Sequence, residues 1–582
     1  MAETPFPIGA ALRRVFQKGY GAAHLRADVM AGTVVGIVAL PLSMALAIAV
    51  GVAPQHGLYT AIFAGTTVAL LGGCKFQVTG PTAAFVVILA PIVSKHGLSG
   101  LLVAGLMAGL LLVGMGLARL GNLIQYIPHP VTTGFTTGIA TVIATLQVKD
   151  VFGLQPGTLP EHYLDRLGAL WAARSTVRLS EFAVAACTLA LLLTVPRVLK
   201  KIPAPLLAIT VVAATVVLIR QLKPDFEVAT IGSRFHTTID GVEVAGIPAV
   251  LPVPALPWGD TPLTFAWVRD LFPAAFAIAM LGAIESLLSA VIADGMTNTK
   301  HDPNSELVGL GIGNIVAPFF GGIAATGALA RTATNIRAGA RSPFASMTHS
   351  VVVLLAILVL APLVAYIPMA SLAALLLLVA WNMSEVHGFA GIVRVAPKSD
   401  VFVLITCFLL TVFFDMIVAV SVGFVLAAIL FMRRMSELTE SHLRLDSSED
   451  GAETVLPPGI LLYEINGPLF FGAAQKAMRA LTAADTGGYR VLVIHLARVP
   501  AIDATGLVAL ENAIASVVRA KRRIVLAGPL PKPHDIFDKA QLTNKYPGLH
   551  IAGDLDAALA LARDLTAESS GTPATSVRVE AH

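Results

Sequence analysis

Two short segments of this chain place a Thr-Gly pair and other small residues inside apolar sequence, and their residue types suit ligand binding. The first runs from Val78 to Phe85 (VTGPTAAF), and the second runs from Ala325 to Arg331 (ATGALAR). Glycine-interrupted apolar segments at corresponding places in two halves are typical of transporters built as inverted repeats, and they mark the substrate site. Because the second segment ends in the cation Arg331, the pattern favours an anionic ligand.

The chemistry expected of these segments is anion binding by helix N-termini. Pro81 lacks an N–H group and fits the first turn of a helix. We therefore predict extended backbone at Thr79-Gly80, a half-helix that starts at Pro81, and the same arrangement at Gly327. Two facing N-termini would offer free N–H groups and positive dipole ends, and Thr82 would add a hydroxyl. The alternative is that the small residues only allow close helix packing.

Three polar residues in apolar surroundings complete the candidate site: Arg331, Glu285 and Ser289. An ionised residue inside a membrane is costly and is a functional hypothesis by default. Glu285 lies in the middle of a predicted span, and Ser289 shares its helix face. A buried carboxyl suits proton uptake, but Glu285 could instead bind a coupling cation or pair permanently with Arg331. Arg331 itself could lie nearer the aqueous edge, with Arg337 and Arg341.

The composition predicts an integral membrane protein. Of the 582 residues, 56% are hydrophobic and 13% are charged, and the mean hydropathy is +0.78. The net charge of +4 is small and spread out, which argues against nucleic-acid binding. The three cysteines form no disulfide framework. We find no nucleophile–base pair, metal-ligand spacing or cofactor motif, so we predict neither an enzyme nor a bound metal or cofactor.

Apolar runs of membrane-spanning length form two sets of seven. They lie near 29–50, 56–72, 78–94, 99–118, 124–147, 181–196, 203–220, 270–293, 305–322, 326–338, 344–365, 369–384, 399–414 and 416–432. Basic residues beside short loops collect on the cytoplasmic side. They place both termini, including an N-terminal segment 1–28, in the cytoplasm.

The chain changes character after the predicted transport domain of residues 29–434. Residues 435–456 are polar and acidic, and we predict a linker. From 457 to 565, strands near 461–465, 491–496 and 523–526 alternate with helical stretches, which predicts a small α/β domain. The Ser/Thr/Ala-rich residues 566–582 are predicted to be disordered.

Several motifs carry a family likeness over nearly the whole chain. The first-span run from Pro41 to Tyr59 and the segment from Ile127 to Phe135 (IPHPVTTGF) resemble the sulfate permease (SulP, solute carrier family 26) transporters. The runs from Ile465 to Gly472 (INGPLFFG) and from Asp503 to Gly506 look like the STAS domain that closes such chains. The chain reads as a bacterial member.

The resemblance implies fourteen spans in a seven-plus-seven inverted repeat, the fold shared with uracil transporters. It implies a core domain of spans 1–4 and 8–11, which moves like an elevator against a gate domain of spans 5–7 and 12–14. It also implies an inner-membrane homodimer with a cytoplasmic STAS domain. The substrate-binding residues would be Leu42, Leu46, Thr82, Ala83, Gly327, Ala328, Leu329, Ala330 and Arg331.

One departure from the family bears on the coupling ion. The resemblance implies a pattern for sodium-dependent bicarbonate members: an acidic residue, a hydroxyl residue four positions later, and Gly-x-Thr in the tenth span. Glu285 and Ser289 match the first part of this pattern, and Gly327 matches the glycine of the second. Here Leu329 stands at the Thr position and offers no hydroxyl, so we predict proton coupling through Glu285 rather than sodium. Thr505 falls where anti-sigma antagonists carry a phosphorylated serine, which makes it a candidate regulatory site.

The function expected from the sequence is secondary active transport of a small anion of the sulfate, bicarbonate or C4-dicarboxylate class. Two alternatives stay open. One is a nucleobase transporter of the same fold, and the other is a membrane-anchored signalling scaffold whose STAS domain, with a cytoplasmic partner, is the output.

Overall fold

The computed structural model divides the chain into two compact units, Met1–Val425 and Leu426–His582. It describes residues 8–17, 19–124, 128–157, 160, 162–199, 203–239, 242–414, 416–437, 440–444, 447–449, 452–454, 456–470, 474–478 and 489–568. Most of the tail predicted to be disordered lies outside these residues. Each unit is treated by itself.

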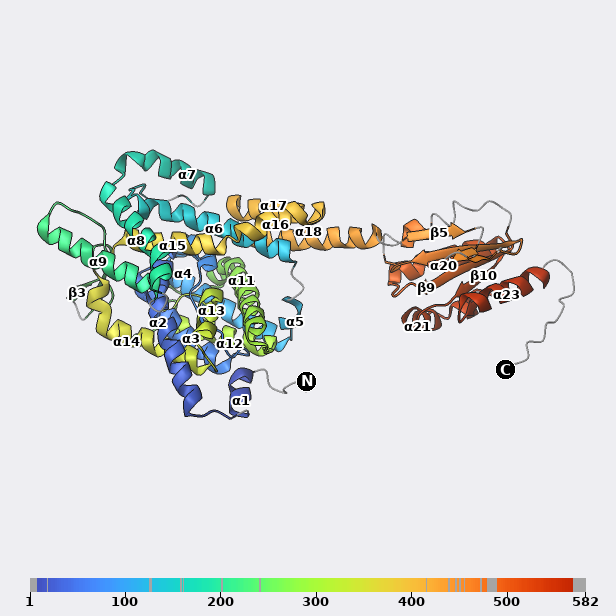
Figure 1. The fold of residues 1–582 in the computed structure, drawn as a ribbon, viewed down its shortest axis with the longest axis horizontal. Helices are drawn as coiled ribbons and strands as arrows, with labels where there is room; N and C mark the ends of the chain where they lie inside the picture. The colour runs from blue at the N-terminus through green and yellow to red at the C-terminus, as the bar shows by residue number, and fades with distance from the viewer. Residues whose placement is uncertain are drawn as a thin grey trace. The chain divides into compact units, whose positions relative to one another are not determined.

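The first unit is helical (Figure 1). Its helices up to the middle of the unit are α1 (Ala10–Gln17), α2 (Ala22–Val50), α3 (Pro54–Leu71), α4 (Ala83–Leu117), α5 (Gly121–Ile124), α6 (His129–Val151), α7 (Tyr163–Ala172), η1 (Ala173–Thr176), α8 (Leu179–Val198), α9 (Ala204–Leu222) and α10 (Ile231–Arg234). The later ones are α11 (Phe265–Thr297), α12 (Pro303–Val316), η2 (Ala317–Phe320), α13 (Leu329–Arg337), α14 (Phe344–Val364), α15 (Met369–Met383), α16 (Val386–Val395) and α17 (Lys398–Phe413). Helix α18 (Met416–Glu437) starts in the first unit and ends in the second.

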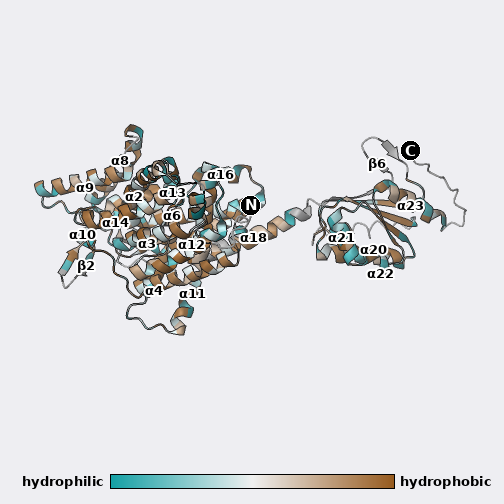
Figure 2. Cartoon of the chain, turned by 90° about the horizontal axis from the view of Figure 1, so that it is seen from below, coloured by the Kyte–Doolittle hydropathy of each residue, from teal (hydrophilic) through white to brown (hydrophobic). Residues whose placement is uncertain are grey.

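Eight stretches within the described residues are long and apolar enough to cross a membrane. They lie at Ala22–Val50, Ala83–Leu117, His129–Val151, Leu179–Val198, Ala204–Leu222, Phe265–Thr297, Phe344–Val364 and Met369–Val395. Figure 2 shows hydrophobic residues along helices such as α4 and α9. The unit is thus a multi-pass membrane domain, and the count of fourteen spans remains a prediction.

Several elements differ from the sequence prediction. Helix α2 begins at Ala22, inside the segment 1–28 that was expected to precede the first span. The third and fourth predicted spans form one element, α4, whose helix is interrupted at Gly97 (φ 67°, ψ −168°). A positive φ of this kind is open to glycine at no steric cost. Helix α16 was not predicted at all.

The two Thr-Gly segments form a pair of very short strands at the centre of the unit. Strand β1 (Thr79–Gly80) runs antiparallel to β4 (Thr326–Gly327), with Thr79 opposite Gly327 and Gly80 opposite Thr326. The Ala328 N–H also donates to the Val78 carbonyl at 2.9 Å. This ladder satisfies backbone groups that could not remain unpaired within a membrane. The prediction of extended backbone followed by half-helices is confirmed, but the first half-helix starts at Ala83 and not at Pro81, because Thr82 still has extended backbone.

A second antiparallel pair lies in the polar stretch between α10 and α11. Strands β2 (His236–Ile239) and β3 (Val242–Ala245) form this hairpin. Its Gly246 N–H donates to the Phe235 carbonyl at 2.7 Å, which closes the base of the hairpin.

The second unit is a mixed sheet with helices on both faces. The sheet order is β11-β10-β9-β8-β5, and only the β5–β8 pair is antiparallel. Buried residues such as Tyr463 and Ile494 form a core on one face, and Leu462 and Val493 form a core on the other. The strands are β5 (Glu440–Arg444), β6 (Ser447–Glu449), β7 (Ala452–Thr454), β8 (Ile460–Asn466), β9 (Val491–Arg498), β10 (Arg523–Ala527) and β11 (Leu549–Ala552), and the helices are α20 (Ala504–Arg519), α21 (Pro531–Lys539), α22 (Leu542–Lys545) and α23 (Leu555–Glu568).

The sheet of the second unit starts earlier than the sequence prediction. Strand β5 pairs with β8 although it lies in the segment 435–456, which was predicted to be a linker. At the other end, α23 continues to Glu568, beyond the predicted boundary at 565. A single polar edge strand is difficult to recognise from sequence because its hydropathy resembles that of a loop.

Candidate functional site

The β1–β4 pair brings two helix N-termini together. Helix α4 starts at Ala83 directly after β1, and α13 starts at Leu329 directly after β4. The residues that precede them, Thr82 and Ala328, have extended backbone and supply no side-chain cap. The first N–H groups of a helix have no partner within the helix, so both ends present donors suited to an anion.

The Thr82 side chain makes no cap hydrogen bond to its own helix and contacts a carboxylate instead. Its hydroxyl donates to Glu285 Oε2 at 2.9 Å. Glu285 extends from α11 and is half-buried, as is Thr82. The predicted coupling residue thus contacts the start of the first half-helix directly.

Arg331 is buried in the first turn of α13, with 2% of its surface exposed. Its Nη2 donates to the Pro81 carbonyl, which lies between β1 and the other half-helix. Its Nε and Nη1 have no hydrogen-bond partner among the described residues. Arg331 therefore does not lie at the aqueous edge with the exposed Arg337, and that alternative is wrong.

A permanent Arg331–Glu285 ion pair is also absent from the described part of the chain. The two charges interact electrostatically, but the carboxylate accepts its hydrogen bond from Thr82 and the guanidinium donates to the Pro81 carbonyl. Both ionisable groups keep capacity for a further partner. This geometry favours a ligand site over a closed structural pair.

Ser289 does not join Glu285, although the two share a helix face. The Ser289 hydroxyl donates to Thr332 Oγ1 at 3.2 Å, and Thr332 Oγ1 also accepts the Val78 N–H at 3.1 Å. The structure thus gives Ser289 a supporting position beneath the strands. The role of Thr332 was not predicted, because a hydroxyl within a short helix has no distinctive sequence pattern.

The remaining predicted residues differ in accessibility. Leu329 is 43% exposed and Ala330 is also exposed, whereas Leu46 is only 1% exposed. Ala83 and Ala328 are buried, each with 7% of its surface exposed. Leu42 is half-buried on α2, a helix that packs against both α4 and α13. Leu46 therefore presents little surface to an anion in this conformation.

Leu329 lines a cavity of about 660 Å³. On one side the cavity is bounded by α11 residues such as Ile284 and Leu287, and on the other by α6 residues such as Thr133 and Thr136. Asp294, Lys300 and His301 also line it. The cavity thus links the start of α13 to a charged rim.

A second cavity of about 400 Å³ lies between the same groups of helices. Val86 of α4 and Pro273 of α11 line it on one side, and Val142 of α6 and Thr411 of α17 line it on the other. Lys95, His96, Arg166 and Asp270 also line this cavity. The two cavities share no lining residue.

Glu306 and Gln77 were not predicted as site residues. The Gln77 amide donates to Ser286 Oγ at 2.6 Å and to Glu306 Oε1 at 2.7 Å, directly before β1. The rule that singles out Glu285 and Arg331 as costly intramembrane charges applies equally to Glu306, which lies in the predicted span 305–322. Gln77 carries no comparable signal.

In the second unit, Thr505 is half-buried in the first turn of α20. The helix is capped by Asp503, whose Oδ1 accepts the Gly506 N–H at 2.6 Å. The predicted helix and its cap are confirmed, and phosphorylation of Thr505 remains a prediction.

The pattern of the Sulfate permease family matches residues 25–407, and that of the STAS domain matches residues 452–558. The chain belongs to the sulfate permease family. The relatives that this chain matches are transporters and not enzymes. The chain is therefore a multi-pass membrane protein of an anion transporter family with a C-terminal STAS domain.

Three proteins illustrate this relationship. YvdB of Bacillus subtilis (strain 168) is 41% identical over 539 residues, which cover 92% of this chain and 97% of YvdB. The bicarbonate transporter BicA of Synechocystis sp. (strain ATCC 27184 / PCC 6803 / Kazusa) is 30% identical, over 92% of this chain and 94% of BicA. The murine anion transporter Slc26a9, in a structure of its inward-facing state, shares the fold with a TM-score of 0.83 at 17% identity, over 97% of this chain and 96% of Slc26a9.

Proposed function

We propose that this sulfate permease family member is a secondary active transporter that binds a small anion between the N-termini of α4 and α13. The observation that carries the proposal is Arg331, which is buried and has two unpartnered nitrogens beside two helix ends without side-chain caps. Charge-assisted bonds from a guanidinium and backbone N–H groups are the donors that oxyanions prefer.

The substrate class that fits is a small oxyanion: sulfate, bicarbonate or a C4-dicarboxylate. The family pattern and the name of BicA as a bicarbonate transporter support this class. Backbone N–H groups accept many oxyanions, so the donors favour the class without selecting a member. Most of the predicted pocket residues lie at the two helix ends, and Leu42 and Leu46 lie on the adjacent α2. Those at the helix ends are Thr82, Ala83, Gly327, Ala328, Leu329 and Ala330.

We propose that a proton is the coupling ion and that Glu285 carries it. Its carboxylate contacts Thr82 at the start of α4, so a change of charge on Glu285 acts directly on the anion site. A sodium ion would need several oxygen ligands, as hard cations do. The Leu329 side chain supplies none, and the Ser289 hydroxyl contacts Thr332 rather than Glu285.

An elevator-type movement is the proposed transport step. The two cavities lie between α4 or α11 on one side and α6 on the other. Movement of the group that contains α4, α11 and α13 against the group that contains α6 and α17 would open one cavity and close the other. We further propose an inner-membrane homodimer with both termini in the cytoplasm.

The test is uptake by purified protein in proteoliposomes. Labelled bicarbonate, sulfate and succinate are supplied with and without an imposed pH gradient. The proposal predicts uptake of at least one anion that increases with an inward proton gradient. Uptake of uracil without any anion would instead support the nucleobase alternative, and no uptake of any solute would support the scaffold alternative.

A further inference from the structure

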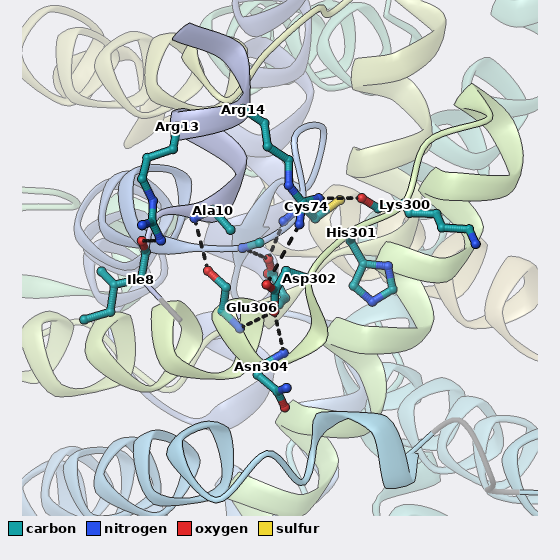
Figure 3. A network of polar contacts seen from close by, with 12 residues as sticks. Ile8, Ala10, Arg13, Arg14, Cys74, Lys300, His301, Asp302, Asn304 and Glu306 are labelled. Atoms are coloured by element: carbon teal, nitrogen blue, oxygen red, sulfur yellow. Dashed lines mark hydrogen bonds and ion pairs between the residues drawn. The ribbon is translucent and has the colours of Figure 1, made fainter. Parts of the chain in front are cut away.

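A buried carboxylate outside the proposed anion site organises the backbone that leads into it. Glu306 of α12 is fully buried. Its Oε2 accepts the Gly73 N–H at 2.8 Å and the Cys74 N–H at 2.9 Å. Its Oε1 accepts Gln77 Nε2 at 2.7 Å and the Ser286 hydroxyl at 3.4 Å. Figure 3 shows Glu306 facing the backbone at Cys74, beside Asp302 and Asn304 at the start of α12.

The donors around this position suit an ionised carboxylate. All four partners donate, and only a carboxylate accepts at both oxygens without offering a hydrogen of its own. A buried charge is tolerated when its lone pairs are satisfied in this way. An amide of the same shape would place an NH₂ group against another donor.

The contact with Gln77 transmits this constraint to the strands. The Gln77 amide also donates to Ser286 Oγ at 2.6 Å, and it lies directly against Gly327 of β4. A Cβ atom on Gly327 would come within 2.3 Å of Gln77 Nε2. Gln77 is two residues before Thr79, so its side chain supports β4 while its backbone leads into β1.

The other end of the same loop is fixed independently. Gly9 N–H at the start of α1 donates to the Leu71 carbonyl at 2.6 Å, and the Ala11 N–H donates to the Gly72 carbonyl at 3.2 Å. The effect of changing Glu306 should therefore fall on residues 73–77 and on the strands beyond them.

We propose that Glu306 is a positioning residue for anion binding, which acts through Gln77 to hold β1 against β4. This inference rests on the proposed function, because it assumes that the anion binds at the helix ends after these strands. Glu306 itself contacts neither Arg331 nor Glu285 in the described structure.

The test compares transport kinetics of Glu306→Gln with a swap in which Gln77→Glu is added. In Glu306→Gln, the new amide NH₂ group faces another hydrogen-bond donor, either the Gln77 amide or the backbone N–H groups of Gly73 and Cys74. It should raise KM for the transported anion at least tenfold with a smaller change in maximal rate, since each 1.4 kcal/mol of lost binding corresponds to tenfold. In the swap, the carboxylate at position 77 accepts a hydrogen bond from the amide at position 306. KM should therefore return to within about threefold of wild type, which corresponds to a loss of well under 1 kcal/mol of binding free energy.

The control is Asp302→Ala, which removes the N-cap of the same helix. Asp302 Oδ1 accepts the Asn304 and Ser305 N–H groups, and the variant should lower the melting temperature with KM unchanged. If Glu306→Gln fails to insert, Ser286→Ala removes one Gln77 contact and should raise KM about fivefold, for a bond of about 1 kcal/mol.

The two ideas fail separately. If KM stays within twofold of wild type in Glu306→Gln, or in Ser286→Ala where that variant replaces it, while Arg331→Gln abolishes binding, the positioning role is overturned and the anion site stands. An elevated KM that the swap does not lower also overturns it. If Arg331→Gln transports like wild type, the proposed function itself fails.

Discussion

Two ionisable residues of opposite sign face the same helix ends without satisfying each other. Glu285 contacts Thr82, and Arg331 contacts the Pro81 carbonyl. A buried guanidinium with free donors is costly unless a ligand completes it. Anion binding would complete it, and Glu285 lies close enough for its protonation to change the affinity of the site.

Replacing Glu285 should separate coupling from transport. Glu285→Gln keeps an oxygen for the Thr82 hydroxyl but cannot take up a proton. We expect proteoliposome uptake to lose its dependence on an inward proton gradient, while exchange of internal for external anion persists. The exposed Glu243→Gln serves as the control. A proton-dependent Glu285→Gln variant would assign coupling to another group.

Removing the Thr82 hydroxyl should change the proton dependence of uptake less than Glu285→Gln does. Thr82→Ala loses one hydrogen bond to Glu285, worth about 1.5–3 kcal/mol for a charged acceptor. We expect a shift in the pH dependence of uptake, because Glu285 loses a donor that favours its charged form. Thr334→Ala is a matched control, since its hydroxyl only contacts its own helix at the Ala330 carbonyl. Identical pH profiles for Thr82→Ala and wild type would contradict the link.

At the scale of elements, two glycines explain how closely the half-helices approach. A Cβ atom on Gly80 would lie 2.6 Å from Arg331 Nη1, and one on Gly327 would lie 2.3 Å from Gln77 Nε2 and 3.1 Å from Ser286 Cα. The first obstacle is the end of a flexible side chain, whereas the second includes backbone. The two positions should therefore respond differently to a methyl group.

Alanine at these glycines should give graded results. Gly80→Ala should displace the Arg331 guanidinium and raise KM about tenfold with little change in stability, if about 1.4 kcal/mol of binding is lost. Gly327→Ala should also lower the melting temperature, since overpacking costs about 1–3 kcal/mol. Gly295→Ala in α11 meets no atom within 4 Å and serves as the control. Unchanged KM in Gly80→Ala would argue against the placement of Arg331.

Much of this element-level arrangement is readable from the sequence, and the reason is physical. Pro81 and the Thr-Gly pairs predict interrupted helices, because proline lacks a backbone N–H and glycine and β-branched threonine have low helix propensity. The pairing register of β1 with β4 and the partners of Ser289 depend on tertiary packing, so helical spacing alone does not show that the Ser289 hydroxyl contacts Thr332. Glu306 was overlooked although its charge carried the same signal as Glu285.

At the scale of the whole molecule, the two compact units have separate cores. The membrane unit contains every residue of the proposed anion site, and the STAS unit contains its own sheet and Thr505. Family patterns that match 25–407 and 452–558 agree with this division. Their short motifs are specific enough to predict the family, whereas the polar edge strand β5 was not distinguished from a linker.

Deleting residues 440–582 tests the division of labour. Because the site lies in the membrane unit, the truncated protein should retain measurable anion uptake, with KM close to that of the full chain. Uptake is compared at equal amounts of protein in the membrane. Complete loss of uptake by a correctly inserted truncated protein would favour a role in which the STAS domain is the output.

The most direct measurement of the central claim is anion uptake by Arg331→Gln beside Arg337→Gln. Both arginines lie on α13, but Arg331 is buried and Arg337 is exposed. Loss of charge-assisted bonds of about 1.5–3 kcal/mol each should raise KM by ten- to a hundredfold or abolish uptake in Arg331→Gln. Arg337→Gln should transport like wild type. Equal, wild-type uptake by both variants would contradict an anion site between the half-helices.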